Sequence, residues 1–131
     1  MKIVLQQACI EFRKGIFKCR RIPYNMSNQT HIHWTEKKKW TDAWHAAVLV
    51  AVLESTERPQ DFARARITII LYKHQPFDPD GAVNAIKPVL DGLRYAHVIQ
   101  NDTTKHIKLS VKQKKVAHKN EERVEIEIIK I

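Results

Sequence analysis

Regular alternation of apolar and polar side chains over residues 62–72 constrains the fold more than any other feature of this chain. Ala65, Ile67, Ile69 and Leu71 stand at every second position and are small or aliphatic, whereas Arg64, Arg66 and Thr68 alternate with them and are polar. Successive side chains of an extended backbone point to opposite faces. The stretch therefore predicts a strand with one apolar and one polar face.

The flanking segments predict further strands and a long helix. Residues 2–10 and 16–22 indicate a hairpin that turns near Lys14-Gly15. Residues 23–33 are polar and turn-prone, which indicates a loop, and Thr35 is a candidate N-cap for a helix over 35–55. Apolar residues recur in that helix at helical spacing and predict a buried stripe: Trp40, Trp44, Ala47, Val48 and Ala51. For the tryptophans, stacking on nucleic-acid bases is the alternative.

The second half of the chain predicts one more helix and two more strands. The helix runs from residue 81 or 82 to 95, and Pro88 indicates either a kink or a later start. Residues 105–116 and 123–131 read as strands, separated by a turn at 117–122. The order β-β-α-β-α-β-β predicts one α/β or α+β domain over 1–131, with a mixed sheet and two main helices.

Charge and hydropathy limit the classes of binding partner and the cellular location to be expected. The 131 residues carry a net charge of +9, which suits a phosphate-rich partner, although a merely soluble basic protein has the same composition. The apolar run over 46–53 is too short to cross a membrane, and the first seven residues lack the features of an export signal. We therefore expect a cytoplasmic protein.

The cysteines and histidines do not form a metal-binding pattern. Cys9 and Cys19 are the only cysteines and form no CxxC pair, so two reduced thiols are expected, with a bridge across the hairpin as the alternative. His31 and His33 have no matching group nearby. We expect them to lie on the surface or to contact phosphate.

Four aspartates stand out in the basic middle of the chain. Asp78, Asp80, Asp91 and Asp102 are the only carboxylates between Asp61 and Glu121. Asp78 and Asp80 follow a strand at a spacing of two, and Asp102 precedes the next strand. If the two strands are neighbours, we expect Asp78, Asp80 and Asp102 to converge at one edge of the sheet. Such oxygen ligands suit Mg²⁺ or Mn²⁺, which promote hydrolysis of phosphate esters.

Residues near these aspartates have candidate supporting roles. Lys87 is placed to stabilise a transition state or to assist proton transfer. Asp91 can pair with Lys87 or Arg94 and is a second-choice metal ligand. Asn101 is a neutral ligand or a turn cap. The structural alternative for the pair itself is that Asp80 caps a helix and Asp78 lies in a turn.

One face of the predicted strand over 105–116 is basic. Lys108, Lys112 and Lys114, together with Arg64 and Arg66, are candidate DNA contacts. The alternative is an ordinary solvated strand face.

Three segments resemble the RusA-type Holliday-junction resolvases: DPDG at 78–81, NAIKPVLDGL at 84–93 and VIQND at 98–102. The family carries a DxDN element, a helix with a K-x-x-x-D-A/G-L pattern and a DD pair before the next strand. A weaker similarity covers 23–40, where the family has a Pro-Asn-rich loop leading into a helix. The clear match spans about a third of the chain.

The resemblance implies a small homodimer that cuts four-way DNA junctions symmetrically with Mg²⁺ or Mn²⁺, in recombination and repair. By position, Asp78, Asp80 and Asp102 match its acids and Lys87 its lysine. Gly81 replaces the usual Asn of DxDN, and Asn101 replaces the first acid of DD. An ungapped alignment through Asn84 would instead place Gly81 and Val83 on the acid positions.

The expected function is a junction-resolving endonuclease, often of phage or prophage origin. A non-catalytic nucleic-acid-binding protein is the rival, and a flap or RNA nuclease is the third possibility.

Overall fold

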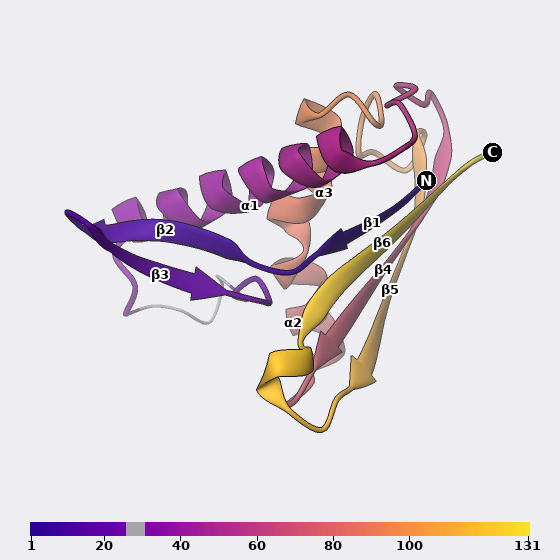
Figure 1. Cartoon of the computed structure of the whole chain (residues 1–131). Helices are drawn as coiled ribbons and strands as arrows, with labels where there is room; N and C mark the ends of the chain where they lie inside the picture. The colour runs from indigo at the N-terminus through magenta and orange to yellow at the C-terminus, as the bar shows by residue number, and fades with distance from the viewer. Residues whose placement is uncertain (26–30) are drawn as a thin grey trace.

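The computed structural model describes residues 1–25 and 31–131. A main sheet has the strand order β1-β6-β4-β5, and β2 and β3 form a separate hairpin (Figure 1). The main-sheet strands are β1 (Lys2–Leu5), β4 (Ala65–Lys73), β5 (Ile107–Lys115) and β6 (Arg123–Lys130), and the hairpin strands are β2 (Ala8–Arg13) and β3 (Ile16–Arg20). The helices are α1 (Trp34–Glu54), α2 (Pro79–Ala85) and α3 (Lys87–Tyr95), with a short 3-10 turn η2 (Lys119–Glu121). This mixed α+β fold confirms the predicted class.

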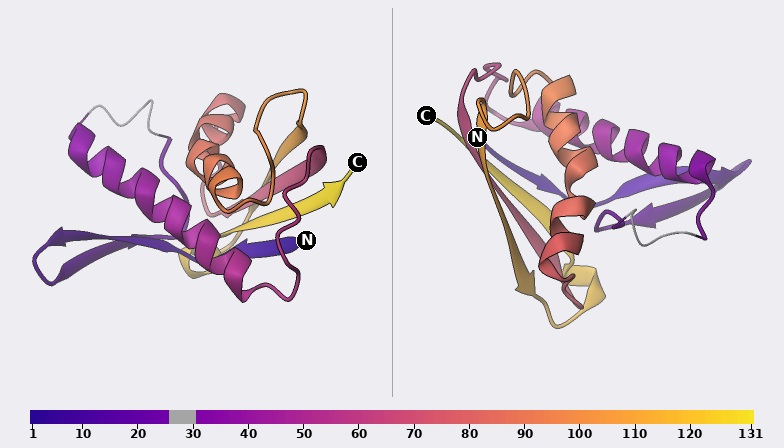
Figure 2. Two further views of the ribbon diagram at one scale, coloured as in Figure 1. Left: turned by 90° about the horizontal axis from the view of Figure 1, so that it is seen from above. Right: turned by 180° about the vertical axis from the view of Figure 1, so that it is seen from behind.

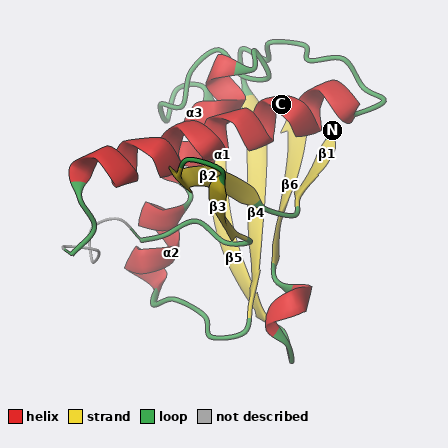
Figure 3. Ribbon diagram, turned by 60° about the vertical axis from the view of Figure 1, so that its left-hand side comes forward, coloured by secondary structure: helices red, strands yellow, loops and turns green. Residues whose placement is uncertain are grey.

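Strand β4 lies inside the main sheet and organises the core. It pairs in parallel with β5 and antiparallel with β6. Its alternate residues Ala65, Ile67, Ile69 and Leu71 are completely buried, which confirms the predicted apolar face. Helices α1 and α3 cover this face, and no described element covers the opposite one (Figures 2 and 3).

Helix α1 is the long helix expected from the tryptophan spacing. Trp40, Trp44, Val48 and Val52 are buried at intervals of four residues, so both tryptophans are core residues as predicted. The N-cap is His33 rather than Thr35, because the His33 Nδ1 accepts a hydrogen bond from the Thr35 backbone N–H at 3.2 Å.

The first predicted strand is two strands. β1 pairs with β6 in the main sheet, whereas β2 pairs with β3. Ile3 and Leu5 are buried at odd positions, and Ala8 and Ile10 at even ones. One straight strand cannot keep both sets on the same face, so the chain bends between them. The turn at Lys14-Gly15 is confirmed, and Gly15 has φ +77°.

The second predicted helix is interrupted, as Pro88 indicates. Ile86 has ψ −4° and separates α2 from α3, and Pro88 lies in the first turn of α3. The two helices follow one another along the same side of the sheet (Figure 2).

A disulfide joins Cys9 to Cys19, contrary to the expected reduced thiols. The two residues are register partners in the hairpin, with their Cα atoms 4.0 Å apart. The predicted loop over 23–33 falls partly on residues 26–30, outside the described residues. Among the described residues, no helix is long and apolar enough to span a membrane.

Candidate functional site

Asp78 and Asp80 lie at the start of α2, shortly after the end of β4. Asp78 is the N-cap of α2, and its Oδ1 accepts a hydrogen bond from the Gly81 N–H at 2.7 Å. Asp80 lies in the first turn and is exposed. The capping role that the structural alternative assigned to Asp80 therefore belongs to Asp78, and the Asp80 carboxylate does not cap the helix.

The backbone just before Asp78 is fixed by β5. The Phe77 N–H donates to Gln113 Oε1 at 2.8 Å, and Gln113 Nε2 donates to the Phe77 carbonyl at 2.8 Å. This reciprocal pair ties the chain to the sheet one residue before the first aspartate. Gln113 could not be singled out from the sequence, because an isolated glutamine in a basic strand has no distinguishing pattern.

Asn25 is the buried polar residue of this region. It is only 6% exposed, and its Oδ1 has no hydrogen-bond partner among the described residues. A Cβ added at Gly81 would lie 2.5 Å from Asp78 Oδ1 and 3.1 Å from Asn25 Nδ2, so Asn25 and Asp78 meet at Gly81. An unsatisfied buried amide oxygen is costly and needs a partner such as a cation or a donor. The only sequence signal for Asn25 is the Pro-Asn-rich character of its loop.

Asp102 does not join Asp78 and Asp80. β4 and β5 are neighbours as supposed, but they run in parallel, with Ala65 opposite Ile107 and Lys73 opposite Lys115. Asp78 follows the end of β4, whereas Asp102 precedes the start of β5, so the two lie at opposite ends of this strand pair (Figure 1). The stretch of β5 from residue 107 to 113 alone covers about 20 Å. The expected convergence of three carboxylates in one chain is therefore wrong.

The described residues hold no group of three His, Cys, Asp or Glu side chains that could bind a metal ion. Asn101 caps its own turn, since its Oδ1 accepts from the Asp102 N–H at 2.8 Å. Any cation at Asp78 and Asp80 would thus be held by a smaller set of protein ligands.

Lys87 and Asp91 share α3 without pairing. Lys87 opens the helix and is exposed, whereas Asp91 is half-buried. Among the described residues, no ion pair joins Asp91 to Lys87 or to Arg94. The Arg94 guanidinium instead lies 5.0 Å from the Tyr95 ring centroid. The ion pair expected between Asp91 and either Lys87 or Arg94 is therefore not formed.

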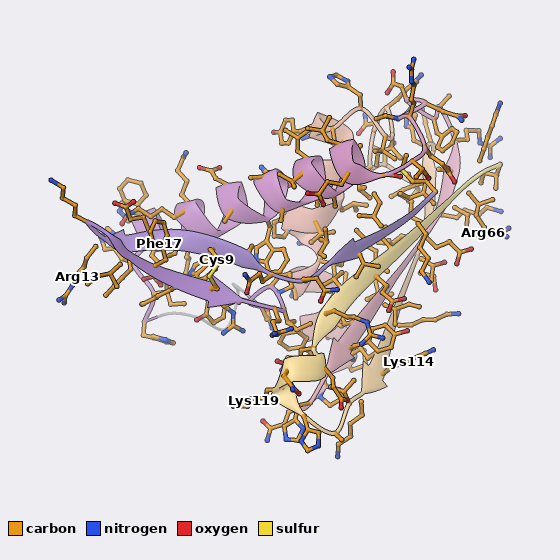
Figure 4. All side chains as sticks on the ribbon, in the orientation of Figure 1. Cys9, Arg13, Phe17, Arg66, Lys114 and Lys119 are labelled. Atoms are coloured by element: carbon orange, nitrogen blue, oxygen red, sulfur yellow. A yellow bond between two sulfur atoms is a disulfide. The ribbon has the colours of Figure 1, made fainter. Side chains whose placement is uncertain are left out.

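The uncovered face of the main sheet carries most of the predicted DNA contacts. The register places Arg66 beside Lys108, and Tyr72 beside Lys114. Figure 4 shows Arg66 and Lys114 directed away from the helices. Lys112 lies between them on the same face of β5, and Arg64 is exposed just before β4. A basic strip thus runs along β4 and β5 and consists of Arg64, Arg66, Lys108, Lys112 and Lys114.

Strand β6 limits the basic strip. Its half-buried Glu125 contacts Arg123 Nε at 2.7 Å and Lys2 Nζ at 3.5 Å. Burial raises the pKa of Glu125, but the hydrogen bonds and charges of Arg123 and Lys2 lower it by more, so its pKa lies below the ordinary value. The Arg123 guanidinium also lies 3.8 Å from the Tyr72 ring centroid.

Comparison with known proteins yields no match among family models, curated proteins or solved structures.

Proposed function

We propose that this chain is a metal-dependent endonuclease that acts on branched DNA, in the manner of the RusA-type resolvases that its sequence resembles. The observation that carries the proposal is the meeting of Asp78 with the buried Asn25 at Gly81, with Asp80 two residues beyond Asp78 in the first turn of α2. Mg²⁺ in proteins is commonly held by one or two carboxylates, water and substrate phosphate. This donor set fits such an ion without Asp102.

The break at Ile86 supports the gapped alignment to the family motif. That alignment requires additional residues between Gly81 and Lys87, and most of these belong to the separate helix α2, which runs from Pro79 to Ala85. It also keeps an acid off position 81, where a Cβ would already meet Asp78. We therefore retain Asp78 and Asp80 as the metal ligands.

Each residue then has a defined task. Asp78 and Asp80 hold the cation. The amide of the buried Asn25 lies beside Gly81 at the start of α2, and Gln113 positions the backbone of Phe77. The cation would activate water and neutralise charge on the phosphate. The basic strip attracts the DNA backbone. Lys87 stabilises charge at the scissile phosphate.

A homodimer belongs to the proposal, because a four-way junction presents two equivalent strands to cut and two-fold symmetry matches them. A cytoplasmic location is proposed as well. The Cys9–Cys19 bridge is the observation against it, since disulfides persist mainly in oxidising compartments. Thiol titration of protein isolated under alkylating conditions tests that point.

A non-catalytic DNA-binding protein is the second candidate, favoured by the distance of Asp102 from the aspartate pair. Incubation of a labelled four-way junction with Mg²⁺, Mn²⁺ or EDTA separates the two functions. The nuclease predicts paired, metal-dependent nicks that Asp80→Asn abolishes while junction binding survives. Asp61→Asn, an exposed aspartate outside the site, is the matched control. Binding without cleavage under every metal would contradict the nuclease.

A further inference from the structure

A pocket separate from the aspartate pair lies between the end of β3, the end of β4 and η2. Its volume is about 540 Å³. Cationic side chains dominate its lining: Arg20, Arg21, Lys73 and Lys119, with His74 beside them. Figure 4 shows Lys119 at this end of the molecule, far from Arg66 at the other end of the sheet. The pocket is thus distinct from the part of the basic strip around Arg66.

Few negative groups in the pocket offset the positive charge of its lining. Among the described residues, Glu122 is the only carboxylate in its lining, and Glu122 Oε2 already accepts a hydrogen bond from the His74 backbone N–H at 2.9 Å. None of the four cationic side chains is in an ion pair with a described residue. The described lining therefore contains four cationic residues and a single carboxylate.

Two of the cations are held in place before any ligand arrives. Arg20 Nε donates to the Ile22 carbonyl at 3.1 Å, and its guanidinium lies 3.5 Å from the Tyr24 ring centroid. Lys73 Nζ donates to the Gln75 carbonyl at 2.6 Å. The terminal nitrogens of Arg20 keep the planar fork that suits phosphate oxygens.

The electrostatics of Lys73 agree with this picture. Burial lowers its pKa, and the charges of Arg20 and Lys119 lower it further against the opposing effect of Glu122. The folded protein therefore keeps this ammonium charged at a free-energy cost that an anion would relieve.

We propose that this pocket binds a phosphate group of a nucleotide or nucleic-acid strand. Its volume exceeds that of a bare phosphate and falls in the range of sites that hold small organic ligands, roughly 300–1,000 Å³. Arg20 and Arg21 contact the phosphate oxygens in two-pronged geometry, and Lys73 and Lys119 add point charges. The site goes beyond the proposed nuclease, because it needs neither a metal nor cleavage.

Inorganic phosphate tests the pocket directly. Titration into ¹⁵N-labelled protein without divalent metal is expected to shift the amide signals of residues 20–21, 73–75 and 119–122. Lys73→Gln and Lys119→Gln should each weaken binding about tenfold, as the loss of one charge-assisted contact predicts. Glu122→Gln should strengthen binding, because it removes the opposing charge while its amide oxygen still accepts from His74. A purely structural role for Glu122 gives no such gain.

Lys130→Gln is the matched control, since Lys130 is exposed at the opposite end of β6 and outside the pocket. Equal weakening by Lys130→Gln, or unchanged binding in both Lys73→Gln and Lys119→Gln, would overturn the proposal. Thermal melts of every variant establish that the fold is intact.

Two oligonucleotides of one sequence, with a 5′-phosphate or a 5′-hydroxyl, identify the source of the phosphate. A loss in Lys73→Gln confined to the phosphorylated strand supports a terminal phosphate. An equal loss for both strands supports an internal phosphodiester. No loss for either strand contradicts binding of nucleic acid in the pocket.

Discussion

At residue 81 the space for a side chain is smaller than a methyl group. A Cβ there would lie 2.5 Å from the Asp78 oxygen that caps α2. At an open helical position Gly→Ala stabilises by about 0.5–1 kcal/mol, whereas losing an N-cap costs about 0.5–2 kcal/mol. Because Asp78 must move in Gly81→Ala, we expect the free energy of unfolding to fall by about 1 kcal/mol. Urea denaturation measures this.

The exposed Val83→Ala in the same helix is the control for Gly81→Ala, and it should change stability little. A Gly81→Ala protein that is more stable than the parent would show that Asp78 does not need its observed position.

Glu125 makes stability depend on pH in the acid range. Its pKa lies below the ordinary value: burial raises it, but the hydrogen bond and charge of Arg123, with those of Lys2, lower it by more. A carboxylate of this kind stabilises the fold above its unfolded-state pKa, about 4.3 for glutamate. That contribution is lost as the pH falls through the folded-state pKa.

Urea denaturation across a pH series tests the role of Glu125. Glu125→Gln should be less stable than the parent at neutral pH, and the difference should shrink as the solution becomes acidic. The exposed Glu127→Gln, on the same strand, serves as the control. A constant difference between Glu125→Gln and the parent at every pH would contradict the stabilising contact with Arg123.

Among the elements, the β2–β3 hairpin extends beyond the main sheet and is closed by its disulfide (Figure 1). The bridge spans ten residues of sequence, and the loop-entropy relation gives about 3 kcal/mol for a loop of this size. Reduction should therefore lower the free energy of unfolding by up to about 3 kcal/mol. Amide hydrogen exchange should accelerate most in β2 and β3. Two titratable thiols in the native protein, or uniform acceleration across the main sheet, would contradict this account.

Local periodicity predicts the elements because each pattern has a local physical cause. The alternation through Ile67 and Ile69 requires a buried face, and Pro88 lacks the N–H that a continuous helix needs. Buried apolar residues stand at odd positions up to Leu5 and at even positions in the strand that begins at Ala8. This change indicates the division into β1 and β2.

Strand pairing has no such local cause. The parallel pairing of β4 with β5 is set by packing of the whole chain, and this pairing separates Asp102 from Asp78. The position of the aspartate pair after β4 could therefore be predicted from the motif at 78–81. The contributions of Asn25 and Gln113 depend on contacts between distant segments and could not.

For the whole molecule, the proposed function depends on how the acidic and basic regions are arranged. The aspartate pair lies at the junction of β4 and α2, and the basic strip lies on the uncovered side of the same strands. The central claim is that Asp78, Asp80 and Asn25 form the cation site and that Asp102 lies outside it.

Paramagnetic broadening by Mn²⁺ in ¹H–¹⁵N spectra tests that claim most directly, because the broadening depends on distance from the bound ion. Substoichiometric Mn²⁺ should broaden the signals around residues 25 and 77–82 and leave those around 101–104 sharp. Mg²⁺ should reverse the effect by competition, and Asp80→Asn should suppress it. Broadening centred on Asp102, or no localised broadening, would contradict the account.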